Sequence, residues 1–392
     1  MEKILIIHNE YKERGGEDIA VEDEIKFLSN HFEVDTVLLL NKIERPYSQF
    51  LSFLTLNNPE SNKLIKKKID EFAPDIIYIH NTWFKASLGI FKTLEEYGVP
   101  IYLKLHNFRY FCTKSIFFKK HLLNQDFCPA CGIRNNGRIF NKYFTNSVFK
   151  SLAVINYGIK YFRIIKSHNL KLFVLTEFHK AFLEKLKISS DKIYVFPNSL
   201  NIPTTNISYP AKEKYFIYAG WISEEKGLKE LCESFLSANL EGVKLKIVGE
   251  GPYLKKLKKE YISNSLQFYG YLPNEEVLNL ISTSLGVITA TKLYEGQPTL
   301  LCEASLLGVL SIFPNNGGIK EFFPSDYPYS FEISKKGDIT YKLIDFYKNY
   351  LTNQDLVNSN KKFLMNKLDN EILLEKFKKV LKVSWIFWKI KK

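Results

Sequence analysis

The sequence predicts an α/β protein with two doubly wound domains, and three observations carry this prediction. Short apolar runs rich in β-branched residues recur along the chain, and each is followed by a polar or glycine-containing turn and a helical segment. A stretch rich in Pro, Asn, Thr and Ser without periodicity, residues 197–214, divides these runs into two series. With 392 residues, the chain is long enough to bury two separate cores.

The first domain is expected over residues 1–200, the second over residues 201–375, and a final helix and tail over residues 376–392. Strands in the first domain are predicted at 3–7, 33–40, 75–81, 100–107, 172–176 and 192–196. A helix is predicted over about residues 84–97. In the second domain, strand–loop–helix units recur about every 20 to 35 residues. Their strands are predicted at 215–220, 245–249, 266–270 and 285–290.

Composition and charge limit the classes of function. The net charge of +13 favours an anionic partner, such as a phosphorylated substrate or an anionic membrane surface. No recognition motif supports nucleic acid as that partner. Five cysteines are too few and too unevenly placed for a disulfide framework, which fits a reducing compartment. The N-terminal apolar run is too short for a signal peptide, and no run approaches the roughly 20 residues that span a bilayer. We therefore expect a cytoplasmic protein.

The most informative stretch is residues 294–308, Tyr-Glu-Gly-Gln-Pro-Thr-Leu-Leu-Cys-Glu-Ala-Ser-Leu-Leu-Gly. It follows a short apolar run, and Pro298 suits the first turn of a helix that Gly308 would end. Glu295 is expected in a loop at the carboxyl end of a strand and Glu303 within the helix, roughly 10 Å away. Carboxylate pairs of retaining hydrolases lie about 5 Å apart. The spacing therefore favours two carboxylates that bind hydroxyls of one elongated ligand, and two solvent-exposed glutamates are the alternative.

Other polar groups also follow predicted strands. Two strands end in His-Asn, at His80 and His106, which places imidazole and amide groups along one sheet edge. For a lone histidine such as His80, a structural role is the alternative. Between the first strand and the first helix, the Gly15-Gly16 turn lets backbone N–H groups approach a phosphate or a sugar.

The Glu-x7-Glu pattern of Glu295 and Glu303 resembles the signature of the retaining family-4 glycosyltransferases. The segment from His80-Asn-Thr-Trp through His106-Asn-Phe-Arg to Cys112 closely resembles members of the same family. The resemblance implies the GT-B architecture, in which two Rossmann-like domains face a cleft. It also implies that the last helix returns to the N-terminal domain.

The resemblance also implies a function. A sugar would pass from a nucleotide-diphosphate sugar, with retention at the anomeric carbon, to a hydroxyl of a lipid-linked or growing surface-polysaccharide acceptor. Glu295 is expected against the donor sugar, Glu303 on the nucleotide ribose, and His106 against the sugar from the N-terminal domain. The further residues expected at the donor are Gly15, Gly16, Gly220, Trp221, Gly251, Tyr271, Gly296, Gln297, Pro298 and Thr299.

Charge at the leaving diphosphate is one point where the chain departs from the family pattern. The family has Gly-Arg followed by a Lys five positions later, whereas this chain has Gly220-Trp221 and keeps Lys226. Lys226 is therefore expected to stabilise the departing diphosphate, together with helix N-termini near Gly251 and Pro298. No Asp-x-Asp pair occurs, so neither a catalytic metal nor another cofactor is expected. A sugar-nucleotide epimerase or hydrolase of the same fold and a catalytically silent binding subunit are the alternative functions.

The cysteine-containing segment leaves two interpretations open. Cys112, His121, Cys128 and Cys131 have the composition of a tetrahedral metal site. The family members carry a further cysteine that this chain lacks over residues 137–140. Packing of the loop by reduced thiols is the alternative.

Two aromatic and basic segments are also ambiguous. Residues 143–163 and 385–388 combine aromatic and aliphatic residues with nearby Lys and Arg. Such segments lie on the inner face of the cell membrane, with their cations toward the head groups, or belong to the core with snorkelling edges.

Overall fold

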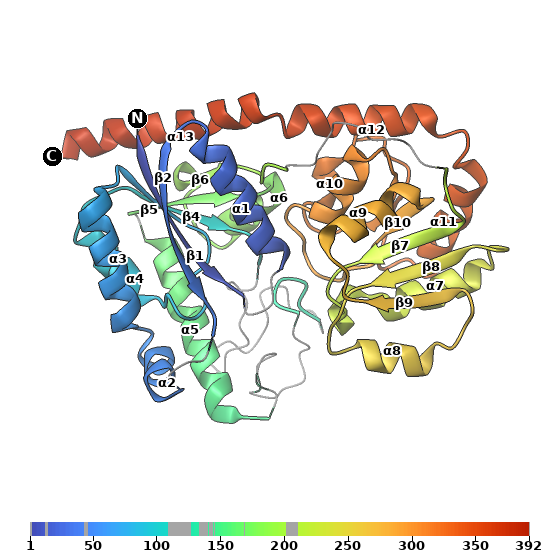
Figure 1. Ribbon diagram of the computed structural model, residues 1–392, viewed down its shortest axis with the longest axis horizontal. Coiled ribbons are helices and arrows are strands. Elements are labelled where there is room, and N and C mark those ends of the chain that lie inside the picture. Colours follow the sequence, from blue (N-terminus) through green and yellow to red (C-terminus); the bar gives the residue numbers. More distant parts are fainter. Residues whose placement is uncertain are drawn as a thin grey trace. The chain divides into compact units, whose positions relative to one another are not determined.

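The chain divides into two compact units in the computed structural model of Figure 1. The structure describes residues 2–11, 15–42, 46–108, 127–132, 140, 144, 146–167, 169–200 and 211–391, except the side chains of residues 46 and 383–391. The first unit contains Met1–Leu200 and Asp369–Lys392, and the second contains Asn201–Leu368. Within the described residues, no helix is both long and apolar enough to cross a membrane.

The first unit is built on a six-stranded parallel sheet in the order β2-β1-β3-β4-β5-β6. Its strands are β1 Lys3–Glu10, β2 Glu33–Leu40, β3 Ile76–Ile79, β4 Ile101–Leu105, β5 Leu170–Val174 and β6 Ile193–Val195. β3 and β4 are buried along their whole length, as expected for parallel strands with helices on both faces. The six strands predicted for this domain are therefore present.

Helices connect these strands and cover the sheet (Figure 1). They are α1 Gly16–Ser29, α2 Pro46–Thr55, α3 Pro59–Phe72, α4 Gly89–Glu95, α5 Val148–Lys166, α6 Glu177–Lys185 and α13 Asn370–Lys391, with a short 3-10 turn, η1, at Ser190–Lys192. Three of them begin at a polar side chain that accepts a hydrogen bond from the first turn: Asn58, Ser147 and Thr176.

The last helix, α13, contributes to the core of the first unit. Its Leu373, Phe377 and Leu381 are buried in one hydrophobic cluster with side chains from β1, β3, β4 and β5. The centroid of the Phe377 ring lies 5.6 Å from that of Phe32 and 5.7 Å from that of Phe173. The second unit therefore ends before the predicted residue 375, because Leu373 already packs in the first unit.

A buried ion pair crosses the same core. Lys104 Nζ on β4 donates to Glu24 Oε2 on α1 at 2.5 Å, with side-chain exposures of 0% and 1%. Tyr78 OH on β3 donates to Glu24 Oε1 at 2.5 Å. Burial and the neighbouring carboxylate raise the pKa of Tyr78, and burial lowers the pKa of Lys104. The three groups tie α1 to two central strands away from water.

The second unit contains another six-stranded parallel sheet, in the order β12-β11-β10-β7-β8-β9. Its strands are β7 Tyr215–Ala219, β8 Lys244–Val248, β9 Leu266–Gly270, β10 Gly286–Ile288, β11 Ser311–Pro314 and β12 Ser330–Phe331. Its helices are α7 Leu228–Ala238, α8 Leu254–Glu260, α9 Asn274–Thr283, α10 Thr299–Leu306, α11 Asp338–Asn349 and α12 Gln354–Lys367, with 3-10 turns η2 at Glu224–Lys226 and η3 at Ile319–Phe322. The predicted α/β fold with two doubly wound, Rossmann-like sheets is confirmed. The linker predicted over residues 197–214 lies largely outside the described residues.

The start of one predicted helix is wrong. The helix expected over about residues 84–97 begins only with α4. Side chains from distant segments take backbone N–H groups before it, because Asn41 Oδ1 accepts from Phe84 N at 3.1 Å and Asn9 Oδ1 accepts from Ala86 N at 2.8 Å. These contacts join segments far apart in the sequence, so local periodicity could not reveal them.

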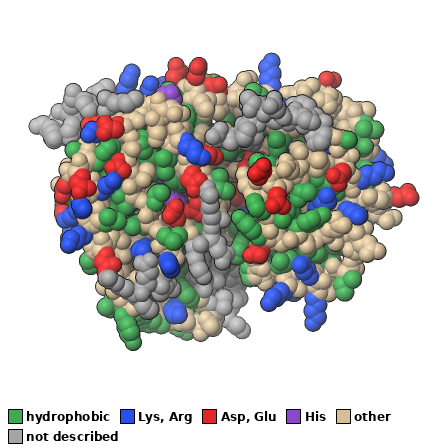
Figure 2. All heavy atoms as spheres, viewed as in Figure 1, with side chains coloured by type: hydrophobic (Ala, Val, Ile, Leu, Met, Phe, Trp, Pro, Cys, Tyr) green, Lys and Arg blue, Asp and Glu red, His purple; other side chains and the backbone are tan. Residues whose placement is uncertain are grey.

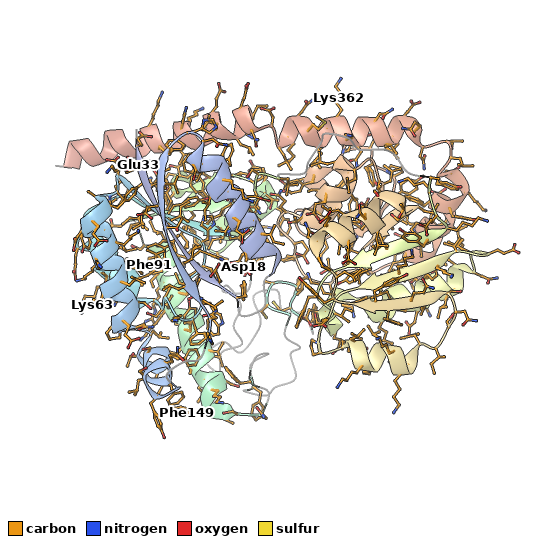
Figure 3. The ribbon with its side chains drawn as sticks, in the orientation of Figure 1. Asp18, Glu33, Lys63, Phe91, Phe149 and Lys362 are labelled. Carbon is orange, nitrogen blue, oxygen red and sulfur yellow. The ribbon has the colours of Figure 1, made fainter. Side chains whose placement is uncertain are left out.

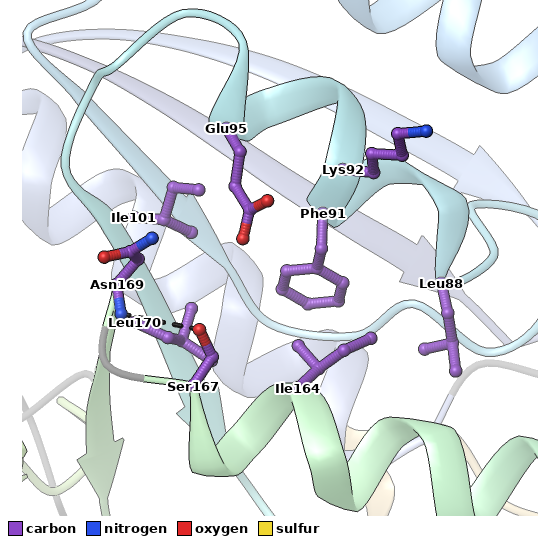
Figure 4. A pocket seen from close by; sticks show the side chains of 9 residues that line it. All are labelled: Leu88, Phe91, Lys92, Glu95, Ile101, Ile164, Ser167, Asn169 and Leu170. Atoms are coloured by element: carbon purple, nitrogen blue, oxygen red, sulfur yellow. Dashed lines mark hydrogen bonds between the residues drawn. The ribbon is translucent and has the colours of Figure 1, made fainter.

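A small cavity lies at the amino ends of β4 and β5 (Figure 4). Its volume is about 210 Å³, and its lining residues are Leu88, Phe91, Lys92, Glu95, Ile101, Ile164, Ser167, Asn169 and Leu170. In Figure 4 the side chains of Phe91 from α4 and Ile164 from α5 approach each other across it. Ligands of open parallel sheets bind outside the carboxyl ends of the strands. The cavity at the opposite edge is therefore not the candidate active site.

Lys104→Met should lower the free energy of unfolding by about 3–5 kcal/mol, because it leaves the Glu24 carboxylate buried without its counter-ion. Urea unfolding followed by far-UV circular dichroism measures the change. Adding Glu24→Gln to Lys104→Met should recover part of the loss, since a neutral amide still accepts from Tyr78. A double variant no more stable than Lys104→Met would show that the uncompensated charge is not the cause.

Candidate functional site

The parallel strands of the second unit bring the predicted donor-site loops to one sheet edge. The loops after β7, β8, β9, β10 and β11 all leave from carboxyl strand ends. Backbone hydrogen bonds join neighbouring loops, from Gly220 N to Val248 O at 3.0 Å, from Gly249 N to Gly270 O at 2.7 Å and from Lys292 N to Glu225 O at 2.9 Å. The edge is therefore one connected surface.

Two glycines allow these loops to touch backbone to backbone. A Cβ on Gly249 would lie 1.9 Å from Gly220 O, and a Cβ on Gly251 would lie 2.1 Å from Ile222 O. Their φ angles of +132° and +153° are ones that L residues with a side chain rarely adopt. Gly251 was predicted from the sequence to bind the donor, and the structure gives it a packing role in the same loop.

Glu295 and Lys226 form an ion pair at this edge. Lys226 Nζ, at the end of η2, lies 2.5 Å from Glu295 Oε1, and the two side chains are 26% and 28% exposed. Thr291 Oγ1 donates to the same carboxylate oxygen at 3.1 Å. Gly318 N donates to Glu295 O at 2.8 Å, which holds the backbone of the glutamate against the loop after β11. Two of the three residues predicted to be catalytic are thus in direct contact.

Glu303 lies on α10, in the helix predicted for it, and is half-buried between the buried Cys302 and Ala304. Pro298 stands at the N-cap rather than in the first turn, and its carbonyl accepts from Leu301 N at 2.9 Å. The other predicted donor residues of this segment are Gly296 and Gln297, which are buried, and Thr299, which is half-buried. The loop and helix around Glu295 and Glu303 therefore follow the sequence prediction with a one-residue shift.

Exposed aromatic rings flank the same edge. Trp221, which follows Gly220 at the end of β7, is 52% exposed, and Tyr271, after β9, is 67% exposed. Trp221 O accepts from Tyr218 OH at 3.0 Å. Burial, with the nearby charge of Glu295, raises the pKa of Tyr218. The hydroxyl therefore remains a donor, and the Trp221 backbone is held while its ring faces outward.

In the first unit, Asp18 organises the Gly15-Gly16 turn. Its Oδ2 accepts from Gly15 N at 2.8 Å, and its Oδ1 accepts from Tyr11 N at 3.3 Å. His8 Nε2 donates to Oδ1 at 2.9 Å, and both side chains are almost fully buried. Sequence reasoning missed His8 and Asp18. The signal available was a histidine at the end of the first strand and an acid in the first turn of the next helix.

His106 lies beside His80 at the carboxyl ends of β4 and β3. His80 Nδ1 and His106 Nε2 are 3.0 Å apart, and the two rings stack with an interplanar angle of 25°. Burial lowers the pKa of both imidazoles well below its usual value, and the positive charge of Lys104 acts in the same direction. His106 and its neighbour are therefore a neutral, hydrogen-bonded pair. This contact joins His80 to the histidine that is predicted to bind the sugar.

The cysteine segment supports no metal site among the described residues. Cys128 and Cys131 are buried, whereas Cys112 and His121 lie outside the described residues. In the described part of the chain, no group of three or more His, Cys, Asp or Glu side chains is placed to hold a metal ion. The structural metal remains a prediction from the sequence.

Charged side chains of both signs are mixed on one face of the molecule. On the face shown in Figure 2, Lys and Arg side chains lie among Asp and Glu side chains on both units. A basic stripe along one face or helix is typical of nucleic-acid binding. The mixture on this face does not have that form.

Residues 206–363 match the family model of glycosyl transferases group 1. This segment contains Lys226, Glu295 and Glu303. The chain is 27% identical over 316 residues to the amylovoran biosynthesis glycosyltransferase AmsD of Erwinia amylovora, with 78% of each chain covered. It is 31% identical over 119 residues to the putative teichuronic acid biosynthesis glycosyltransferase TuaC of Bacillus subtilis (strain 168), covering 30% of this chain and 28% of that one.

Solved structures share the fold of the whole chain. Sucrose-phosphate synthase from Thermosynechococcus elongatus superposes with a TM-score of 0.71 at 13% identity, covering 98% of this chain and 100% of that one. HepE from Anabaena, in complex with UDP-glucose, superposes with a TM-score of 0.64 at 13% identity and the same coverage. The two Rossmann-like sheets therefore match the GT-B fold of these proteins.

Asp18→Asn should destabilise the first unit at neutral pH, and this effect should shrink in acid. Burial by itself raises the pKa of Asp18, but hydrogen bonds from His8, Gly15 N and Tyr11 N outweigh it and lower the pKa. A carboxyl whose pKa is lowered on folding contributes stability above its unfolded pKa, about 3.9, and loses this contribution as the pH falls through the folded value.

Thermal unfolding of wild type and Asp18→Asn across this pH range measures the difference. The gap in Tm should be widest above about pH 5 and should narrow progressively as the pH falls below the unfolded pKa, about 3.9. A gap that is constant over this range would contradict the role assigned to the ionised carboxylate.

Proposed function

Because the chain carries a glycosyl transferases group 1 domain and is a glycosyltransferase, we propose that it is a retaining family-4 enzyme. Its donor is a nucleotide-diphosphate sugar, and no catalytic metal is needed. Its acceptor is a hydroxyl of a lipid-linked or growing surface polysaccharide. The names of AmsD and TuaC, amylovoran and teichuronic acid biosynthesis glycosyltransferases, support this acceptor class. The HepE complex with UDP-glucose supports the donor class.

The observation that carries the proposal is the Lys226–Glu295 ion pair at the carboxyl edge of the second sheet. Transfer requires a cation where negative charge gathers on the departing diphosphate and acceptors for the hydroxyls of the sugar. Lys226 supplies the first and the Glu295 carboxylate the second, and both stand on loops joined by backbone hydrogen bonds. The half-buried Glu303 is assigned to the nucleotide ribose.

His106 of the first unit is assigned to the sugar because of the family resemblance. As a neutral imidazole it can donate one hydrogen bond to a sugar oxygen. The Gly15-Gly16 turn, held by Asp18, offers backbone N–H groups at the same edge of that unit.

One observation favours a second candidate. Trp221 stands where the family pattern has Arg, and its ring is 52% exposed at the donor-site edge. One side-chain cation fewer would leave the leaving group with less stabilisation, so a subunit that binds nucleotide sugars without turnover is the alternative. The retained Glu295, Glu303, His106 and Lys226 favour the active enzyme, in which the Trp221 ring packs against the donor.

Lys226→Ala should lower kcat by about 100-fold or more, because charge-assisted hydrogen bonds to the diphosphate are lost. Trp221→Arg should be tolerated or activating. Release of nucleoside diphosphate in the presence of acceptor and EDTA measures both. Lys229→Ala is the matched control, since its ammonium pairs with Glu260 at 3.3 Å on the outer helices α7 and α8.

Two outcomes would overturn parts of this assignment. Activity lost in EDTA and restored by magnesium would contradict the metal-free mechanism. Nucleotide-sugar binding without turnover in wild type, with transfer appearing in Trp221→Arg, would establish the silent-subunit alternative.

We also propose that the first unit contacts an anionic membrane surface, as the charge of +13 suggests. Six of the twelve Ala, Val, Leu, Ile, Phe and Tyr side chains of α5 are buried and only Val148 and Phe149 are exposed, which supports the core interpretation for the rest of this helix. The side chains of residues 385–388 lie outside the described ones. The exposed apolar groups form what we call the α2–α5 patch: Tyr47, Phe50, Leu51, Val148 and Phe149.

The α2–α5 patch has the chemistry of an interfacial surface. The Phe50 and Phe149 rings lie 6.0 Å apart and join the two helices, and Phe149 is labelled in Figure 3. α2 carries no charged residue, and α5 carries Lys150, Lys160, Arg163 and Lys166 but no acid. Aromatic and aliphatic groups beside cations favour a bilayer with anionic head groups.

Leu51→Ser combined with Phe149→Ser should reduce co-flotation of the protein with anionic liposomes, because less apolar surface enters the interface. Tyr341→Ser combined with Leu351→Ser is the matched control, since these residues are 62% and 78% exposed in the second unit. Wild type should float with anionic but not neutral liposomes, and high salt should release it. Equal flotation of wild type with anionic and neutral liposomes would contradict the proposal. Flotation of the Leu51→Ser, Phe149→Ser variant equal to that of wild type would also contradict it.

A further inference from the structure

We propose that His80 is a positioning residue that fixes the tautomer of His106, so that His106 keeps its proton on Nδ1 and presents it as a hydrogen-bond donor. The inference rests on the proposed function only where it gives His106 a sugar contact. The tautomer itself can be tested without any reaction.

The two rings are held as one rigid pair. His80 and His106 follow β3 and β4, which are paired in parallel register. The 3.0 Å separation between His80 Nδ1 and His106 Nε2 is a hydrogen-bond length. The centroid of the His80 ring also lies 4.4 Å from that of the Tyr78 ring, and the Tyr78 hydroxyl donates to Glu24. His80 therefore has little freedom to turn.

Only one of the two facing nitrogens can carry a proton when both rings are neutral. Burial disfavours protonation of either ring to an imidazolium. The charged or titratable neighbours act in the same direction, and they are Lys104 on β4, His8 on β1 and His179 on α6. The charge of Lys104 is paired with Glu24, and His8 donates to Asp18. The contact is therefore a neutral donor–acceptor pair with a single direction.

The surroundings of His80 determine which of the two nitrogens donates the hydrogen bond. His80 is 3% exposed, and its Nε2 is buried without a hydrogen-bond partner among the described residues. A buried N–H group without an acceptor is rare in proteins, whereas an unsatisfied acceptor is tolerated more often. The proton of His80 therefore sits on Nδ1 and is donated to His106 Nε2. His106 must then carry its own proton on Nδ1.

His106 is placed to use that proton. It is half-buried, less enclosed than His80, and the described residues give its Nδ1 no hydrogen bond. An N–H group held in one direction by a fixed neighbour can donate to a sugar or phosphate oxygen without reorganising, which is the property a binding site needs.

Long-range ¹H–¹⁵N correlation spectra of histidine-labelled protein test the tautomer directly. The chain contains seven histidines, and His106→Asn identifies the signals of His106. In wild type, His106 should show a protonated Nδ1 and an unprotonated Nε2. His80→Phe, which keeps the ring but removes the donor, should shift His106 toward the other tautomer. His80→Asn places an amide N–H near the position of Nδ1 and should restore the wild-type pattern.

A His106 protonated on Nε2 in wild type would overturn the inference, whatever the protein catalyses. In the transfer assay, His80→Phe should lower kcat by about 10- to 100-fold, as loss of an orienting partner does, and His80→Asn should recover most of it. His31→Phe is the matched control, since His31 lies at the amino edge of the same sheet against Phe27. If wild type shows the assigned tautomer but His80→Phe keeps the wild-type kcat, His80 has no positioning role in transfer. Absence of transfer in every variant, wild type included, would count against the proposed function alone.

Discussion

Parallel strand pairing is the constraint on which the rest of each unit depends. When every strand points the same way, every strand-to-helix loop must leave at the same edge, and polar residues distant in sequence meet there. In the first unit this brings His80 and His106 together, and in the second it brings Lys226 on the loop after β7 to Glu295 on the loop after β10. Sheet topology therefore determines which polar side chains meet at each edge.

Much of this could be read from the sequence, because its signals are local. The β-branched runs predicted both sheets, and the spacing in residues 294–308 placed Glu295 in a loop and Glu303 in α10. Polar residues at predicted strand ends indicated the carboxyl edges, where the structure brings several of them together. A run of apolar residues and a proline or glycine near a helix end need no knowledge of the rest of the chain.

The remaining features could not be read because they depend on partners far apart in sequence. The His8–Asp18 bond, the Lys104–Glu24 pair and the late start of α4 each require a neighbour that only the folded sheet supplies. The position of Lys226 was predicted, but its pairing with Glu295 was not, since the two lie 69 positions apart. Sequence patterns supplied the candidate residues, and tertiary packing determines which of their side chains are in contact.

The glycines at Gly249 and Gly251 have a consequence for how a ligand would be received. Because two strand-end loops already touch backbone to backbone, their conformational entropy was lost when the domain folded. A molecule arriving at this edge finds the loops in place and does not have to order them. More of its interaction free energy therefore remains as affinity. By the same reasoning, a side chain at either position would separate the two loops. A ligand at this edge would then have to order them, and its affinity would fall.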